Sequence, residues 1–286
     1  MAQKERISWE GYGLLGPSLV VMVLALAGPL LLLAITSFRS QNGIGFTQGW
    51  TLAQYGVVLG RSSYRDLLMR SVLISGLVSL VTVALAYPIA YFVAFKAQRK
   101  FLWLIALTIP FWTSYLLRVF AWKIILGFNG VINSGLTQLH LIARPLGFLL
   151  YNPFAVVVTL AHAWAAFAIL PIYVSLEKVD RSLLEAASDL GDGPLRRFAR
   201  ITLPLSMPGV IGAAILIFVP TTGDYVTPQL VGGAKGTMIA NLIEVEFNGV
   251  GNWPLGAALS LVGMAVVGAF AGLFVAAARA ATKAAR

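Results

Sequence analysis

The dominant pattern in this sequence is a series of long apolar stretches separated by polar segments rich in glycine and proline. Six stretches reach, or nearly reach, the ~20 residues that a helix needs to cross the hydrocarbon core of a bilayer. Five of them contain no charged residue, and the third carries Arg118 and Lys123. The six cover about residues 13–36, 71–95, 101–126, 154–176, 205–222 and 255–278. We therefore expect an all-α integral membrane protein with six transmembrane helices in one domain, residues 1–286.

The first apolar stretch follows two basic residues, Lys4 and Arg6, and so imitates the start of a secretory signal peptide. The apolar core of a signal peptide is only about 7–15 residues long. Here the run continues through Leu30–Ile35. We interpret it as a first span that is retained.

Basic residues are distributed unevenly over the connecting segments. Thirteen Lys and Arg residues lie on the side of both termini and the second-to-third and fourth-to-fifth loops, against six on the other side. Short cytoplasmic loops of membrane proteins carry such an excess. We therefore expect both termini and the longest of these loops, residues 177–204, in the cytoplasm.

Composition excludes several functional classes. The net charge of +10 is mostly explained by topology, and no array of basic and aromatic residues indicates a nucleic-acid partner. Zero cysteines and two separated histidines provide no metal cluster. The spans contain no catalytic pair typical of an intramembrane enzyme. Gly232–Thr237 is glycine-rich, but a Lys followed by Ser or Thr after glycine never occurs, so the chain has no phosphate-binding loop.

The fourth-to-fifth loop has the pattern of a helical hairpin. Ser182 and Glu185 have the spacing of a capping box, which predicts a helix start. Gly191 can take the positive φ that ends a helix, and Pro194 suits the first turn of the next one. The first helix then carries a narrow apolar stripe made of Leu183, Ala186, Ala187 and Leu190. On the second helix Leu195 and Phe198 share a face before Leu203-Pro204 leads into the fifth span.

This hairpin resembles a known motif. Glu185-Ala186-Ala187, three residues, Gly191, nine residues, then Ile201-x-Leu203-Pro204 is similar at every anchor position to the EAA motif of binding-protein-dependent ABC transporter permeases. The resemblance implies a type I ABC importer permease fold and a coupling helix seated in a cleft of an ATPase subunit. The coupling residues it implies are Leu183, Glu185, Ala186, Ala187, Leu190, Gly191, Leu195, Phe198, Ile201, Leu203 and Pro204.

Four further stretches look like the spermidine/putrescine branch of these permeases. They are Ile109–Trp122, Gly223–Gly233, Asn241–Phe247 and Asn252–Ser260. A bacterial inner-membrane importer of polyamines is therefore expected. The implied partners are an extracytoplasmic binding protein, a second permease subunit, the lipid bilayer, and two ATPase subunits that bind ATP and Mg²⁺. Permeases for iron chelates, phosphonates, opines or amino-acid-like solutes share parts of these stretches, so another small solute is the alternative, ahead of a stand-alone secondary transporter.

A path for polyamines is expected to be lined by carboxylates and aromatic faces, because an ammonium group is attracted to both. The candidates are Asp224, Tyr225, Glu244, Glu246, Trp112, Tyr115 and Phe218. A helix-end or ion-pair role is equally open for Asp224. Glu244 and Glu246 also suit a surface contact to the binding protein or an internal pair, and the aromatics suit an interfacial belt.

Arg118 lies inside the third apolar stretch, where a cation is costly unless it faces a partner or water. A cationic substrate would not bind to it. We expect a structural ion pair with Asp224, Glu244 or Glu246, with a positive barrier in the resting pathway as the alternative.

Overall fold

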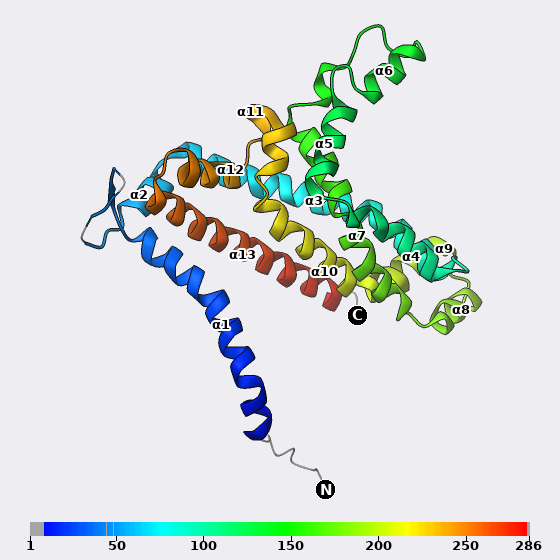
Figure 1. Cartoon of the computed structure of the whole chain (residues 1–286). Coiled ribbons are helices and arrows are strands. Elements are labelled where there is room, and N and C mark those ends of the chain that lie inside the picture. The colour runs from blue at the N-terminus through cyan, green and yellow to red at the C-terminus, as the bar shows by residue number, and fades with distance from the viewer. Residues whose placement is uncertain (1–8, 44, 48, 285–286) are drawn as a thin grey trace. The chain divides into compact units, whose positions relative to one another are not determined.

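The computed structural model describes residues 9–43, 45–47 and 49–284, and nearly all of these are helical (Figure 1). Lys4, Arg6 and Arg286, which enter the orientation argument, lie outside the described residues. The chain forms two compact units, Met1–Arg61 with Val245–Val262 and Ser62–Glu244 with Gly263–Arg286. Helix α13 (Trp253–Ala284) runs through both units. The single domain over residues 1–286 stays a prediction.

Within the described residues, six helical segments are long and apolar enough to cross a membrane, which confirms the predicted number. They are Leu15–Ser37, Ser62–Phe95, Tyr115–Gln138, Pro153–Glu177, Pro194–Thr222 and Trp253–Ala276.

The third apolar stretch differs from its prediction, because it is not one continuous helix. Helix α4 (Lys100–Thr108) passes into a 3-10 turn, η1 (Ile109–Trp112), and α5 (Tyr115–Leu126) begins only after a break. Thr113 is extended at the break, with ψ of 152°. Pro110 explains the interruption, since it removes a backbone donor and its ring excludes the carbonyl one turn back. The continuous span predicted for 101–126 is therefore wrong.

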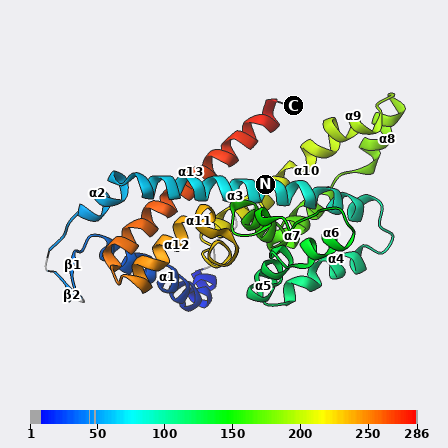
Figure 2. The same cartoon turned by 90° about the horizontal axis from the view of Figure 1, so that it is seen from above.

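Three helices form the core of the second unit: α3 (Ser62–Phe95), α7 (Pro153–Glu177) and α10 (Leu203–Thr222), which pack against one another (Figure 2). Their contact surfaces are apolar and closed to solvent. Fully buried side chains among them include Val78, Val93, Leu160, Ile172 and Ile217.

Helices α7 and α10 approach each other at Gly209. A Cβ atom on Gly209 would lie 2.5 Å from the backbone oxygen of Pro171 and 2.5 Å from Cβ of Ser175. The Gly209 amide also donates to Oγ of Ser175 at 3.3 Å. Glycine is therefore required here by space, because the two backbones are nearly in contact.

The segment after α10 is helical rather than loose. Pro220 lies inside α10, which continues to Thr222 and is followed by Gly223. The short helices that follow are η4 (Pro228–Gly232), α11 (Gly233–Gly236) and α12 (Ile239–Glu244), with η5 (Val245–Gly249) in the other unit. Gly233 has φ of 57°, and a Cβ there would lie 2.5 Å from the Tyr151 oxygen, so this segment packs on the start of α7.

The segment between α5 and α7 is organised by one side chain. It contains α6 (Val131–Gln138) and η2 (Gly147–Leu149). Asn133, only 1% exposed, accepts from the Leu146 amide at 2.8 Å and donates to the Leu146 and Gly127 oxygens at 3.2 Å. These bonds satisfy backbone groups that would otherwise lack partners.

The first unit contains α1 (Trp9–Ser37), a small hairpin of β1 (Gln41–Asn42) and β2 (Gly45–Phe46), and α2 (Ala53–Gly60). Its long-range contacts come from Gln41, whose side chain donates to the Gly251 oxygen at 2.7 Å and accepts from the Trp253 amide at 3.1 Å. The apolar window of α1 has no buried residue.

The contact at Gly209 gives a testable prediction. Gly209→Ala places a methyl group into the α7 backbone, and overpacking of this kind costs about 1–3 kcal/mol. We expect a lower Tm for the purified protein in detergent. Gly212→Ala is the matched control on the same helix, because a Cβ at Gly212 meets nothing within 4 Å. Equal Tm values for the two variants would contradict the close packing.

Candidate functional site

The helical hairpin predicted between the fourth and fifth spans is present and begins at Asp180. Helix α8 (Arg181–Asp189) is capped by Asp180, whose Oδ1 accepts from the Ser182 amide at 2.9 Å. This bond stabilises the carboxylate and lowers the pKa of Asp180 below its usual value. The capping box of Ser182 and Glu185 is therefore wrong. The aspartate two residues earlier takes the capping position, and Glu185 is exposed.

The end of α8 confirms the role expected of Gly191. Gly191 has φ of 86°, its amide donates to the Ser188 oxygen at 2.9 Å, and the Asp192 amide donates to the Ala187 oxygen at 2.9 Å. This pair of bonds is the Schellman motif, which reverses the chain after a helix. Helix α9 (Pro194–Arg197) then begins with its proline in the first turn, as predicted.

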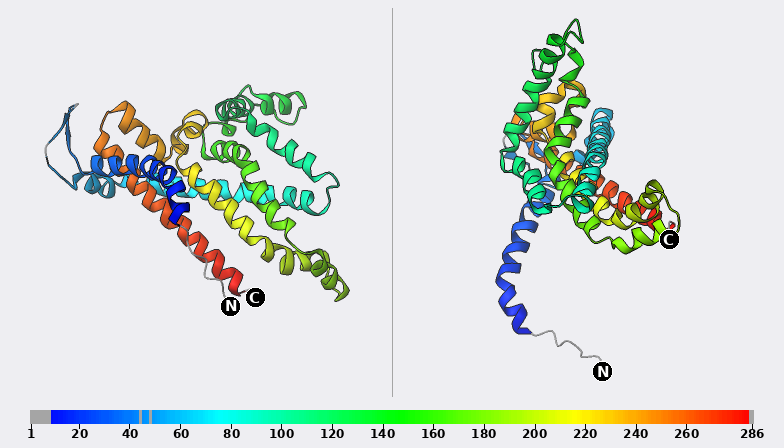
Figure 3. Two further views of the ribbon diagram at one scale, coloured as in Figure 1. Left: turned by 60° about the horizontal axis from the view of Figure 1, so that its bottom comes forward. Right: turned by 90° about the vertical axis from the view of Figure 1, so that its right-hand side faces the viewer.

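The tip of the hairpin exposes an apolar surface, the tip leucines Leu183, Leu190 and Leu195. Their side chains are 47%, 87% and 81% exposed, whereas Ala187 is buried. Ala187 therefore packs inside the hairpin, and the leucines of the predicted stripe face outward. Figure 3 shows the hairpin at the end of α10 remote from α5 and α6. The tip of the hairpin therefore carries exposed apolar side chains.

Phe198 joins the hairpin to the helical core. Its ring lies edge-on to the rings of Tyr87, at 5.6 Å, and Tyr91, at 6.4 Å, both on α3. The Tyr87 hydroxyl is 2.8 Å from Oγ of Ser206 near the start of α10. Phe198 and Ile201 lie in a π-helical segment, η3 (Phe198–Thr202), that passes without a break into α10 at Leu203-Pro204. The hairpin is therefore connected to α3 through Phe198 and to α10 through an unbroken helix.

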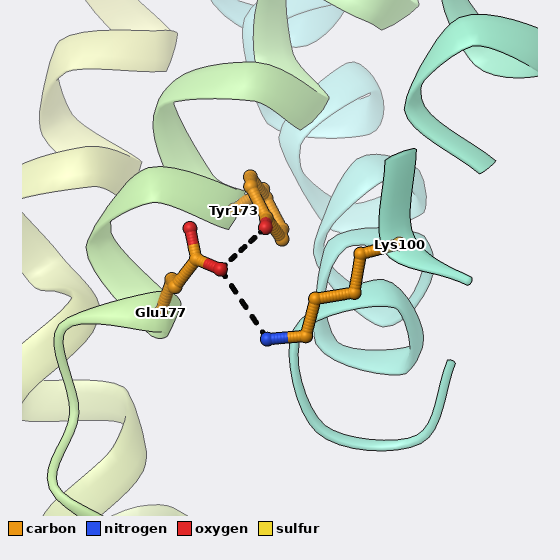
Figure 4. A network of polar contacts seen from close by, with 3 residues as sticks. All are labelled: Lys100, Tyr173 and Glu177. Carbon is orange, nitrogen blue, oxygen red and sulfur yellow. Dashed lines mark hydrogen bonds and ion pairs between the residues drawn. The ribbon is translucent and has the colours of Figure 1, made fainter. Parts of the chain in front are cut away.

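A polar network holds the end of α7, where the chain enters the hairpin. Glu177, the last residue of α7, accepts from the Tyr173 hydroxyl at 2.6 Å and from Lys100 Nζ at 3.3 Å (Figure 4). Lys100 is the first residue of α4. Sequence reasoning counted Lys100 only as a topology signal and missed this pairing, because nothing local links residues so far apart in the chain.

At the opposite end of α10, Asp224 is half-buried and fully engaged. Its Oδ2 accepts from the Tyr115 hydroxyl, while Oδ1 accepts from the Val226 amide at 2.9 Å and the Thr227 amide at 3.4 Å. The Tyr115 hydroxyl is also 2.5 Å from Oγ1 of Thr227. Asp224 thus has the helix-end role that the sequence left open, and it is joined to one of the candidate aromatics.

Arg118 is held by aromatic rings and a carbonyl group. Its Nη1 donates to the Ala163 oxygen at 3.1 Å, and Cζ lies 4.7 Å from the ring centre of Phe111 and 5.9 Å from that of Tyr115. The expected ion pair with Asp224, Glu244 or Glu246 is not present among the described residues. The carboxylate of Asp224 is instead used by Tyr115 and by backbone amides, and Glu246 belongs to the other unit.

The remaining candidates do not gather around Asp224. Trp112 is 90% exposed. Phe218 lines a separate apolar cleft of about 520 Å³ with Phe270 and Phe274. Glu246 is buried, and desolvation raises its pKa above the usual value. Tyr225 is exposed, and Glu244 ends α12.

The model of one protein family, the binding-protein-dependent transport system inner membrane component, matches residues 17–281. The chain belongs to this family. Members are inner-membrane components of transport systems, so the six apolar helices are those of a multi-pass inner-membrane protein.

Curated relatives cover most of the chain. The spermidine/putrescine transport system permease protein PotB of Escherichia coli (strain K12) is 37% identical over 250 residues, which are 86% of this chain and 90% of that protein. PotB of Haemophilus influenzae is 34% identical over 82% of each chain. The inner membrane ABC transporter permease protein YdcU of Escherichia coli is 30% identical over 84% of each chain.

Solved structures support the fold. A chain of a bacterial ABC transporter involved in import of the acidic polysaccharide alginate has a TM-score of 0.74, with 16% identity and 95% of each chain covered. A second alginate transporter structure, in complex with an alginate pentasaccharide-bound periplasmic protein, has a TM-score of 0.75, with 16% identity over 96% of each chain. The chain therefore has the fold of an ABC importer permease, as the EAA motif predicted.

The turn at Gly191 can be tested locally. Gly191→Val forces a β-branched residue into the left-handed region, which costs about 1–3 kcal/mol. We expect hydrogen exchange of the last α8 amides to become roughly tenfold faster. Gly193→Val is the control, because Gly193 is extended at φ of −67° and has open space around its Cβ position. Unchanged exchange in Gly191→Val would show that the Schellman turn is not what ends α8.

Proposed function

We propose that this chain is a permease subunit of a binding-protein-dependent ABC importer and forms half of a translocation pathway for polyamines. The observation that carries the proposal is identity of 34–37% over more than four fifths of the chain to permeases named for spermidine/putrescine transport. The contact of Tyr115 with Asp224 supports the substrate class, since it joins an aromatic face to a carboxylate.

The proposed assembly contains four kinds of partner. A soluble binding protein delivers substrate on the extracytoplasmic side, a second permease subunit completes the pathway, and two ATPase subunits bind ATP and Mg²⁺ in the cytoplasm around a complex embedded in lipid. Both termini and the hairpin face the cytoplasm, which is supported by the excess of Lys and Arg on that side. This chain acts in transport and leaves ATP hydrolysis to its partners.

The tip leucines are suited to enter a cleft of the ATPase subunit, because they are exposed and apolar at the end of a short rigid hairpin. Closure of the ATPases would then move α8 and α9 as one body. Phe198 transmits this movement to α3, and the unbroken helix transmits it to α10. Because Gly209 locks α10 to α7, the movement reaches the end of α10 near Asp224 and the middle of α7, where Ala163 contacts Arg118.

Charge at Asp224 is the first test of the substrate class. Asp224→Asn keeps an oxygen for the Val226 amide but removes the negative charge that attracts an ammonium group. We expect spermidine uptake into cells to fall by roughly tenfold, as loss of about 1.4 kcal/mol of cation attraction would give. Asp66→Asn, an exposed position on α3, is the control for charge alone. Spermidine uptake and affinity that stay at the wild-type level would favour another solute.

Phe198 is the test of coupling. Phe198→Ala removes the ring contacts with Tyr87 and Tyr91, so hairpin movement no longer drives α3. We expect the membrane complex to assemble but to hydrolyse ATP without matching uptake, with transport reduced roughly tenfold or more. Phe128→Ala, at an exposed phenylalanine away from the hairpin, should change neither activity. Normal coupling in Phe198→Ala would remove this contact from the mechanism.

A further inference from the structure

The charge of Arg118 is not neutralised by any ion pair within the described part of the chain. Nη1 has one neutral acceptor, the Ala163 oxygen, and Nε is buried without any acceptor among the described residues. A cation placed inside a membrane span in this way is costly, and such residues normally face a functional pathway. Asp224, one of the carboxylates expected to pair with Arg118, is instead bonded to Tyr115 and to backbone amides.

The groups around the Arg118 guanidinium are Phe111, Tyr115 and the Ala163 carbonyl, which we call the Arg118 cage. The guanidinium lies over both rings, at 4.7 Å and 5.9 Å, and donates to the carbonyl at 3.1 Å. Aromatic faces and a carbonyl oxygen are also the groups that bind alkylammonium ligands. The hydroxyl of Tyr115 extends the cage to the carboxylate of Asp224.

We propose that Arg118 occupies this cage in the resting permease as a tethered substitute for the cationic substrate. While the guanidinium is in place, its charge repels cations and closes the path to them. Incoming substrate gains the cage and Asp224 only when ATP-driven movement of α7 and α10 shifts the Ala163 carbonyl and frees the rings. The proposal rests on the proposed function for the identity of the substrate, but the cage is defined by this chain alone.

A purely structural arginine makes a different prediction. Such a residue acts through its hydrogen bond to Ala163, so any side chain that donates there should replace it. A tethered cation acts through its charge, so a neutral donor should fail and a lysine should succeed. Arg118→Gln keeps a neutral amide donor on a side chain two bonds shorter than that of arginine, and Arg118→Lys keeps the charge.

The experiment measures flux of radiolabelled guanidinium ion through membrane vesicles that contain the assembled transporter, without ATP and without binding protein. We expect Arg118→Gln to raise this flux about fivefold or more over the wild type, and Arg118→Lys to leave it near the wild-type rate. Arg70→Ala is the matched control, because Arg70 also donates to a backbone carbonyl, that of Ala234 at 3.4 Å, outside the cage. Flux in Arg118→Gln equal to that in Arg70→Ala, or equally raised flux in the Gln and Lys variants, would overturn the proposal.

A second variant tests the proposal even if Arg118→Gln does not insert into the membrane. Phe111→Leu keeps the arginine but removes the ring nearest to it, so the guanidinium is held less firmly and guanidinium flux should rise at least twofold. Flux that stays at the wild-type level in Phe111→Leu would contradict the cage. ATP-driven spermidine uptake by wild-type vesicles supplied with binding protein is measured in parallel. If wild-type vesicles do not take up spermidine, polyamines are not the substrate. The guanidinium flux still tests the role of Arg118, because it does not depend on spermidine.

Discussion

The contact between Gly209 and the backbone of α7 is the constraint on which the rest of the structure depends. A single absent Cβ lets two apolar helices meet nearly backbone to backbone, at Pro171 and Ser175. Without a hydrophobic driving force between helices in lipid, such close packing is a main source of association. It makes α7 and α10 one element whose two ends carry the hairpin and the surroundings of Asp224.

Polar and aromatic contacts extend this rigidity to the base of the hairpin. Phe198 packs on α3, and Glu177 binds Lys100 at the start of α4. Both segments that connect the hairpin to the core are therefore held in place. The tip leucines remain exposed. In the proposed mechanism, a displacement of the tip is passed on to the helices, because these contacts hold both ends of the hairpin to them.

The elements that could be predicted from the sequence are those set by local chemistry. The number of spans follows from apolar length, and the turn of the hairpin follows from Gly191 and Pro194, whose conformational preferences need no distant partner. Prediction failed where a nearby residue took the expected structural role or interrupted a helix, and where the contact partner lies far away in the sequence. Asp180 displaced the capping box, Pro110 broke the third span, and the rings that receive Phe198 lie more than a hundred residues earlier in the chain.

The candidate site shows the same division. The sequence identified Tyr115 and Asp224 as candidates for a cation path and Arg118 as a cation inside an apolar stretch, which are local observations. The sequence could not show which of these residues contact one another. An acid and a base suggested an ion pair, and the role of Tyr115 was not foreseen. In the structure Tyr115 stands between the two charges: its hydroxyl binds Asp224 and its ring faces Arg118. The carboxylate is thus bonded to Tyr115 and to backbone amides, and the guanidinium has no ion pair with it among the described residues.

The most direct test of this account is an intramolecular distance measured by pulsed electron spin resonance. The chain has no native cysteine, so Ser188→Cys on α8 and Tyr225→Cys beyond α10 can be spin-labelled alone. In the complete transporter, the account predicts one narrow distance distribution that is the same with and without a non-hydrolysable ATP analogue, because hairpin, α7 and α10 move as one body. A distribution that splits or shifts when the nucleotide binds would show a joint between the hairpin and α10, and would contradict rigid-body coupling.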